Sequence, residues 1–253
     1  MVYYISSKRI NPQLVSFDWN NRSVWYSYNR SFVGISLILS CLAFAGSVLV
    51  FLYQNYTRIF NLPIQYYFLL VIFPLLAFSY SFKIPFTEKF ALRKFGILKP
   101  FILGFAWAGF VTAFPIIALK AEGRYDVNNR LPEIWLFMQN FIFISVLCII
   151  FDIKDEQSDK KQKLRTIPVL LGVRQTVYFI IIPLTIINLI IKASVMHAYQ
   201  NPFLPIVLRS IPNIILVAVS LQVRSTKSTL YYLAIIDGMM LVKALTGILS
   251  IYL

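Results

Sequence analysis

The chain has 253 residues, of which 58% are hydrophobic, and its mean hydropathy is +0.71. Soluble domains are typically about 45–50% apolar, so this composition excludes a soluble globular domain and indicates an integral membrane protein. The net charge of +14 does not indicate nucleic-acid binding, because the basic residues are spread over short loops between apolar segments.

Seven apolar segments have roughly the length of about 20 residues that a helix needs to cross a bilayer. The second is short and contains Pro74. We see no internal repeat and no ladder of charges in mid-span, which disfavours a transporter or channel. The expected spans are residues 31–54, 65–82, 100–119, 134–151, 175–196, 203–222 and 229–253.

Lysine and arginine are concentrated in alternate loops, at residues 1–30, 83–99, 152–174 and 223–228. By the positive-inside rule, these loops are predicted to be cytoplasmic. We therefore expect a protein of the cell (inner) membrane. It would have a cytoplasmic N-terminal segment, residues 1–30, and a transmembrane domain, residues 31–253, whose aspartate-rich loop is also cytoplasmic. Two basic residues, Arg209 and Lys243, fall inside spans, and we assign them no function.

Three aspartates, Asp152, Asp155 and Asp159, directly follow the fourth predicted span. Spacings of three and four residues place them within about 60° of one another around a helix. Basic residues follow at once, and this combination suits a Mg²⁺-bridged diphosphate, because Mg²⁺ takes oxygen ligands from protein and phosphate together. The spacing alone fits a solvated turn at the membrane surface equally well.

The stretch from Asp152 to Gly172 resembles the second aspartate-rich motif of the UbiA superfamily of intramembrane prenyltransferases. In that motif a D-x-x-D-x-x-x-D run leads to a basic segment and then to R-T-x-P-V-x-x-G, which this chain supplies from Arg165 onward. A second block, Ser79-Tyr80-Ser81 and then Gly104 to Ala108, is similar to the family's tyrosine-serine loop and alanine-tryptophan helix. The resemblance implies an all-α fold, a polytopic membrane helical bundle with about seven transmembrane helices here.

The resemblance also implies an activity, the transfer of a prenyl group from a prenyl diphosphate to a lipid-soluble acceptor, commonly aromatic, with Mg²⁺ as cofactor. In such a reaction the protein stabilises the charge of the leaving diphosphate and excludes water from the allylic cation. The resemblance makes Asp152, Asp155 and Asp159 the metal ligands and catalytic residues. The implied substrate-binding residues are Lys83, Arg93 and Arg165, with Lys160 as a weaker candidate and with Tyr80, Trp107 and Phe141 lining a prenyl chamber.

The chain departs from the family in lacking its first aspartate motif, N-x-x-x-D-x-x-x-D. Before Glu88 the sequence has one carboxylate, Asp18. Because the family has nine helices, we expect the chain to begin near the end of the family's second helix. Either its sequence starts late or it is a natively short member.

With half of the metal shell missing, two alternatives to the transferase stay open. The chain is then a catalytically impaired or truncated relative that binds isoprenoid lipid or a partner, or it is a terpene cyclase of the same superfamily. A cyclase would need no acceptor, so analysis of the product separates it from the transferase.

Overall fold

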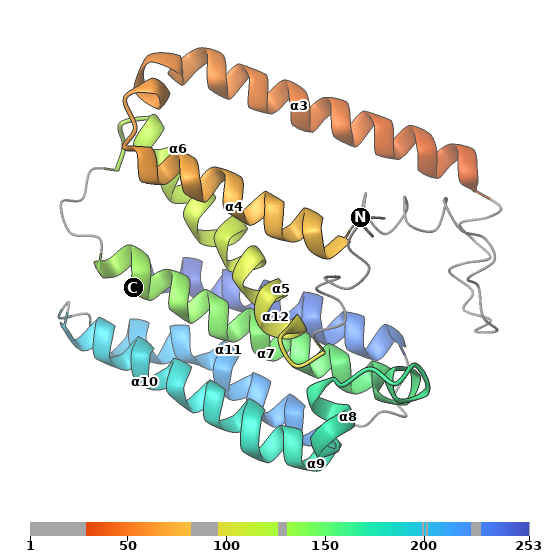
Figure 1. The fold of residues 1–253 in the computed structure, drawn as a ribbon. Coiled ribbons are helices and arrows are strands. Elements are labelled where there is room, and N and C mark those ends of the chain that lie inside the picture. The colour runs from red at the N-terminus through yellow and green to blue at the C-terminus, as the bar shows by residue number, and fades with distance from the viewer. Residues whose placement is uncertain are drawn as a thin grey trace. The chain divides into compact units, whose positions relative to one another are not determined.

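The computed structural model describes residues 29–81, 96–125, 131–198, 200, 202–223 and 229–252. Every regular element in these ranges is a helix, which confirms the all-α prediction. The chain divides into two compact units, Met1–Leu62 and Pro63–Leu253, which are described separately (Figure 1). The predicted domain boundary at residue 30 stays a prediction.

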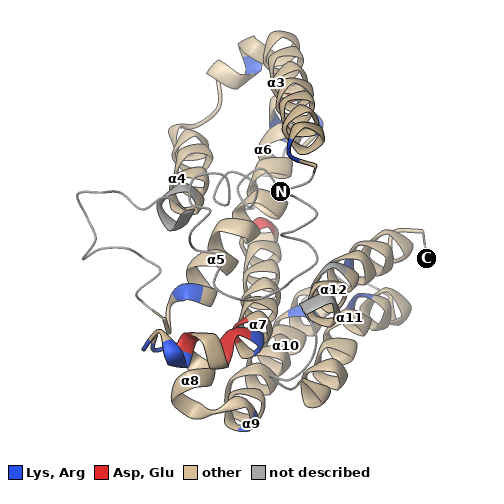
Figure 2. Cartoon of the chain, turned by 90° about the vertical axis from the view of Figure 1, so that its right-hand side faces the viewer, with Lys and Arg blue, Asp and Glu red and all other residues tan. Residues whose placement is uncertain are grey.

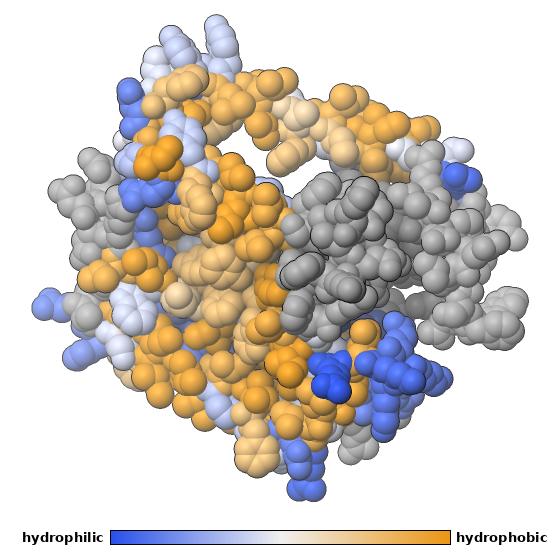
Figure 3. All heavy atoms as spheres, viewed as in Figure 1, coloured by the Kyte–Doolittle hydropathy of each residue, from blue (hydrophilic) through white to orange (hydrophobic). Residues whose placement is uncertain are grey.

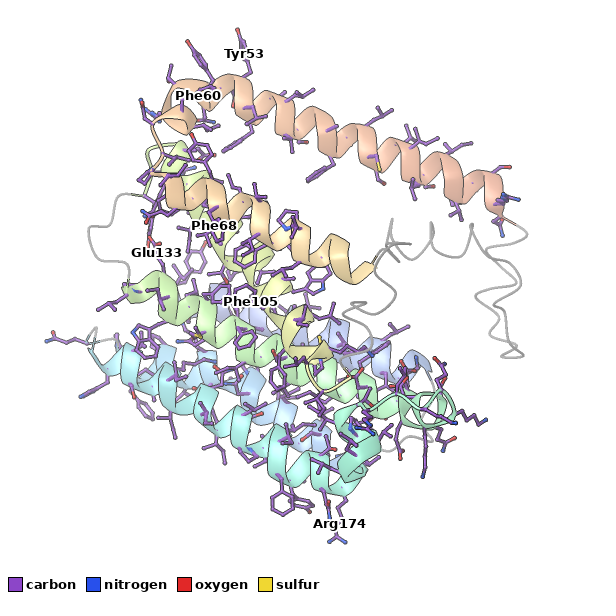
Figure 4. All side chains as sticks on the ribbon, viewed as in Figure 1. Tyr53, Phe60, Phe68, Phe105, Glu133 and Arg174 are labelled. Atoms are coloured by element: carbon purple, nitrogen blue, oxygen red, sulfur yellow. The ribbon has the colours of Figure 1, made fainter. Side chains whose placement is uncertain are left out.

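The described part of the N-terminal unit is one long helix, α3 (Arg30–Phe60). Its 31 residues span about 46 Å at 1.5 Å per residue, more than the hydrocarbon thickness of about 30 Å. Tyr53 and Phe60, labelled in Figure 4, lie near its C-terminal end. The hydroxyls of Ser36, Ser40 and Ser47 each donate a hydrogen bond to the carbonyl four residues earlier, so these polar groups are satisfied within an apolar helix.

The C-terminal unit is built from antiparallel helices and short helical turns. In chain order these are α4 (Ile64–Ser81), α5 (Lys99–Ala108), η4 (Gly109–Ala113), α6 (Phe114–Ala121), α7 (Leu131–Lys161), α8 (Ile167–Leu171), α9 (Val173–Thr176), η5 (Val177–Ile181), α10 (Ile182–Ala198), α11 (Phe203–Gln222) and α12 (Thr229–Leu249).

Six helical segments among the described residues are long and apolar enough to cross a membrane, and they coincide with six of the seven predicted spans. They are Arg30–Phe60, Lys99–Ala121, Leu131–Lys161, Val173–Val195, Phe203–Gln222 and Tyr231–Leu249. The remaining predicted span, 65–82, is also helical, but its apolar segment Ile64–Ala77 is shorter. The chain is therefore a polytopic helical membrane protein, with a largely hydrophobic surface over these helices in Figure 3.

Two of the spans contain a π-helical turn, η4 and η5, and each turn ends two residues before a proline, Pro115 or Pro183. Proline has no N–H to donate, and its ring clashes with the carbonyl four residues earlier. A wider turn just before the proline accommodates the ring. The helix therefore continues through both prolines, as the predicted spans required.

The central element of the C-terminal unit is α7, which contacts α5, α8, α10 and α12 (Figure 1). The middle of α7 carries a run of buried apolar side chains that forms much of the core. Its members are Phe143, Val146, Leu147, Ile149, Ile150 and Ile153.

Helices α5 and α7 approach closely at Gly104. A Cβ placed on Gly104 would lie 2.1 Å from Ser145 Oγ and 3.0 Å from Ser145 N. Small residues at such a contact let two membrane helices pack backbone against backbone. This contact fixes the position of α5 along α7.

We expect Gly104→Ala to lower the free energy of unfolding by about 1–3 kcal/mol, because the added methyl overpacks the contact with Ser145. Gly247→Ala in α12 is the matched control, since a Cβ there meets nothing within 4 Å. Thermal unfolding in detergent measures both variants. Equal stability of the two would contradict the close packing of α5 on α7.

Candidate active site

The aspartates that the sequence singles out lie in the last turns of α7, which continues to Lys161. The predicted span ends at residue 151, and the helix continues for ten residues beyond it. Because Asp152, Asp155 and Asp159 all lie within this helix, their spacing of three and four residues places them on one face of it, as predicted. Figure 2 shows acidic and basic segments gathered at this end of α7, beside α8.

The first aspartate is held by a residue that we did not single out. Asp152 is buried, and its Oδ1 accepts a 2.5 Å ion-paired hydrogen bond from Lys99 Nζ at the start of α5. Its other oxygen, Oδ2, is buried and has no hydrogen-bond partner among the described residues. The pair thus neutralises one carboxylate and leaves its second oxygen buried and without a described partner.

The chain reverses direction after α7 in a tight turn. Lys163 has a φ of +56°, and the N–H groups of Lys163 and Leu164 donate back to the carbonyls of Lys160 and Asp159. These two bonds form the Schellman pattern, with lysine in the left-handed position that glycine usually takes. The turn brings Arg165 and Thr166 back toward the start of α5.

A glycine is required where that segment meets the start of α5. Gly96 is buried, and a Cβ on it would lie 2.2 Å from the carbonyl oxygen of Arg165 and 2.7 Å from the N of Thr166. The side chain of Thr166 is buried too, and its Oγ1 has no hydrogen-bond partner among the described residues. The arginine–threonine pair of the motif therefore packs directly against the residues that lead into Lys99.

The other predicted site residues divide into three groups. Asp159 is buried, whereas the Asp155 side chain is 35% exposed and lies 3.3 Å from Lys154 Nζ. Lys160 and Arg165 are exposed at the same end of α7. Lys83, Arg93 and the Tyr80 side chain lie outside the described residues.

The aromatic residues also differ from one another in placement. Trp107 is 54% exposed and is not among the residues that line the aromatic cavity described below. Phe141 is half-buried, and its ring centroid lies 6.1 Å from that of Phe105. Phe105 itself was not expected at the site, although its position six residues after the lysine that opens a span was a usable signal.

An aromatic cavity of about 220 Å³ lies among α4, α5, η4, α6 and α7. Phe105 and Glu133, both labelled in Figure 4, are among its lining residues. Six further members that contribute to its apolar wall are Leu69, Phe73, Ala113, Ile116, Ile134 and Phe137.

Polar groups gather at one end of the cavity. Glu133 lies 2.8 Å from Lys120 Nζ, which also donates a 2.6 Å hydrogen bond to the hydroxyl of Tyr66. Glu133 lies in the first turn of α7 and Asp152 lies 19 positions later in the same helix, so this polar group and the aspartate group are about 28 Å apart along the helix.

A family model described as the UbiA prenyltransferase family matches residues 30–234, which include the aspartates, the Arg165–Thr166 pair and the start of α12. The chain belongs to the UbiA prenyltransferase family. Searches of curated proteins and of solved structures found no match for this chain. Membership in the UbiA family implies prenyltransferase-type activity within a membrane, on prenyl diphosphates and lipid-soluble acceptors.

UbiA-family enzymes generally use Mg²⁺, so the fit of the described residues to that ion can be tested. No three carboxylate, histidine or cysteine side chains in the described ranges come together around one point. Mg²⁺, however, commonly takes only one or two carboxylates, with substrate phosphates and water filling its octahedron. The open Oδ2 of Asp152 and the half-exposed Asp155 fit that smaller requirement.

We expect Lys99→Met and Asp152→Asn each to lower the free energy of unfolding. The loss for Lys99→Met should be about 3–5 kcal/mol, because this substitution leaves a buried carboxylate without its cation. The double variant should lose less than the sum of the two single losses, with a coupling of at least about 1 kcal/mol. Thermal unfolding of the four proteins in detergent gives this cycle. Additive losses would mean that the pair contributes nothing to stability.

Proposed function

We propose that the chain is an intramembrane prenyltransferase that moves a prenyl group from a prenyl diphosphate to a lipid-soluble, aromatic acceptor with Mg²⁺. The observation that carries this proposal is the junction of α7, α5 and the Arg165–Thr166 segment. It joins carboxylates, a half-buried lysine and exposed basic residues at one end of an apolar helix bundle.

The diphosphate would bind at this junction, with Asp152 and Asp155 as the Mg²⁺ ligands. Bound Mg²⁺ would supply charge neutralisation for the diphosphate. Arg165 and Lys160 are exposed beside these carboxylates and would add positive charge for the phosphate oxygens. Lys99 holds the Asp152 carboxylate in place through its ion pair.

The prenyl tail would run from the junction toward the aromatic cavity. Phe105 lies six positions after Lys99 on α5, about 9 Å further along the helix axis. Beyond Phe105 the cavity wall continues with apolar and aromatic side chains as far as Glu133. Such a wall excludes water from an allylic cation, and its aromatic faces stabilise positive charge.

The orientation follows from the distribution of basic residues. We infer that the aspartate end of α7 faces the cytoplasm of a cell (inner) membrane, because exposed lysines and arginines are concentrated there. Figure 3 shows hydrophilic atoms at this end of the C-terminal unit.

Binding of an isoprenoid diphosphate without turnover is the second candidate function. It is favoured by the ion pair of Asp152 with Lys99, which leaves fewer negative charges for metal ions. A member of this kind would bind the diphosphate but release no inorganic diphosphate when an acceptor is added.

The proposal predicts saturable, Mg²⁺-dependent binding of geranylgeranyl diphosphate to the detergent-purified chain. Asp155→Asn should weaken binding at least tenfold, because it removes a half-exposed carboxylate ligand. Glu156→Gln is the matched control, since it removes the same charge one position further around the helix, 100° away. Binding is measured by equilibrium titration with and without Mg²⁺.

Three outcomes of that titration are decisive. Binding lost only in Asp155→Asn supports the aspartate face as the diphosphate site. An equal loss of affinity in both variants would mean that the total negative charge, and not the position of Asp155, determines binding. No binding by the unaltered chain would reject the site. Release of inorganic diphosphate on addition of an aromatic acceptor then separates transfer from binding alone.

The cavity predicts a preference for chain length. Ala113→Leu fills part of the cavity that Phe105 and Glu133 also line. The affinity for long prenyl diphosphates should therefore fall at least about tenfold more than the affinity for geranyl diphosphate. Ala193→Leu, at an exposed position of α10, should leave the preference unchanged. Competition between diphosphates of different length measures it, and an unchanged preference in Ala113→Leu would place the tail elsewhere.

A further inference from the structure

A second group of charges lies inside the bundle, away from the aspartates. Lys192 on α10 is 5% exposed, and its Nζ donates a 2.5 Å hydrogen bond to the backbone carbonyl of Arg209 on α11. The guanidinium of Arg209 in turn donates from Nε to Ser250 Oγ at the end of α12, at 2.6 Å. Two cations from neighbouring helices thus share one polar region.

A third cation joins them from α12. Lys243 Nζ donates to Asn140 Oδ1 on α7 at 2.5 Å and lies 4.2 Å from the centroid of the Phe143 ring. Asn140 is itself fixed by a 2.7 Å hydrogen bond from its Nδ2 to Thr112 Oγ1. The charge of Lys192 acts on Lys243, and that of Arg209 acts on Lys192, so the three cations repel one another.

Lys192 is buried, whereas Arg209 and Lys243, which fall inside predicted spans and were assigned no function from the sequence, are half-buried. Figure 2 shows basic segments on α11 and α12 among the helices. We call Lys192, Arg209 and Lys243 the cationic cluster.

Unpartnered amide groups lie on the same helix faces as the cationic cluster. Asn213 follows Arg209 by four residues on α11 and is fully buried, and neither its Oδ1 nor its Nδ2 has a hydrogen-bond partner among the described residues. Asn188 precedes Lys192 by four residues on α10, is 2% exposed, and its Oδ1 is also without a described partner. A buried amide left in this way costs about 1–3 kcal/mol.

The described residues supply this region with donors but with no carboxylate. Each ammonium group has three N–H donors, and one hydrogen bond is described for each lysine. Asp237 is also on α12, but it lies six positions before Lys243, which places it about 120° away around the helix axis. An anion that is not part of these helices would neutralise the charges and accept a hydrogen bond from Nδ2 of Asn213.

We propose that the cationic cluster, with Asn213, is a binding site for a small oxyanion, the carboxylate or phosphate group of a lipid or a free anion. The site is separate from the proposed diphosphate site. Asn140 lies twelve positions before Asp152 on α7, about 18 Å along the axis.

The test measures thermal unfolding of the detergent-purified full chain in a sulfonate buffer at constant ionic strength set with sodium chloride. One arm adds sodium phosphate or sodium acetate. The other arm compares micelles doped with phosphatidylglycerol and with phosphatidylcholine. The unaltered chain should show a saturable rise of several degrees in at least one arm, since a ligand bound only to the folded state stabilises it. The arm that responds identifies the source of the anion.

Two charge-removing variants locate the effect. Lys192→Met and Lys243→Met should each raise the melting temperature without added anion, because they relieve repulsion, and each should lose the anion-dependent rise. Arg174→Gln is the matched control, because Arg174 points away from the helices in Figure 4, and this variant should keep the rise. Since both lysine variants leave Lys99 and Arg165 intact, binding of phosphate at the diphosphate site cannot produce the expected loss.

Three results would overturn the proposal. The first is the absence of a rise in the unaltered chain in both arms. The second is a rise of equal size in Lys192→Met and Lys243→Met. The third is a rise that appears only in Asp237→Asn, which would show that the counter-charge comes from this chain.

Discussion

The packing of α5 against α7 determines where every described residue of the proposed diphosphate site lies. Two contacts define it. At the first contact, the backbone of Ser145 lies against Gly104. At the second, about 8 Å closer to the start of α5, Lys99 forms an ion pair with Asp152. The glycine permits the close approach, and the ion pair selects the register, because a buried carboxylate without a cation is costly. Once this pair of helices is set, Gly96 lies against the backbone of Arg165 and Thr166.

Charges inside this bundle occur in two different arrangements. At two places on α7 a lysine from the α5–α6 segment meets a carboxylate, Glu133 in the first turn and Asp152 nineteen positions later. Between α10, α11 and α12 the described cations instead meet carbonyls, hydroxyls and amides. In the first arrangement each lysine is neutralised by a carboxylate of the same chain, and the pair stabilises the fold. The second accumulates positive charge in a region of low dielectric, where an anion would interact strongly.

Much of the fold could be predicted because its signals are local. Hydropathy located all seven helical segments, and the three-and-four spacing placed Asp152, Asp155 and Asp159 on one helical face. The helix then continued to Lys161, because polar residues with good helical propensity follow the apolar run. The motif also identified the family, which the match over residues 30–234 confirmed.

The contacts between helices could not be predicted in this way. Lys99 and Asp152 are 53 residues apart, and nothing in the spacing of either indicates the other. The described partner of Lys243 is Asn140 on α7, which lies 103 residues earlier in the sequence. A cation inside a span that is held by an amide of another helix cannot be recognised from the pattern of its own segment.

The two ion pairs between α7 and the α5–α6 segment affect how the protein fits its bilayer. Lys99–Asp152 and Lys120–Glu133 join the same two helical segments about 28 Å apart, which is close to the hydrocarbon thickness of about 30 Å. A thinner bilayer would leave apolar side chains in water, and a thicker one would draw both pairs into lipid. The separation of the two ion pairs therefore favours a bilayer whose hydrocarbon thickness is close to the same length, and disfavours thinner or thicker membranes.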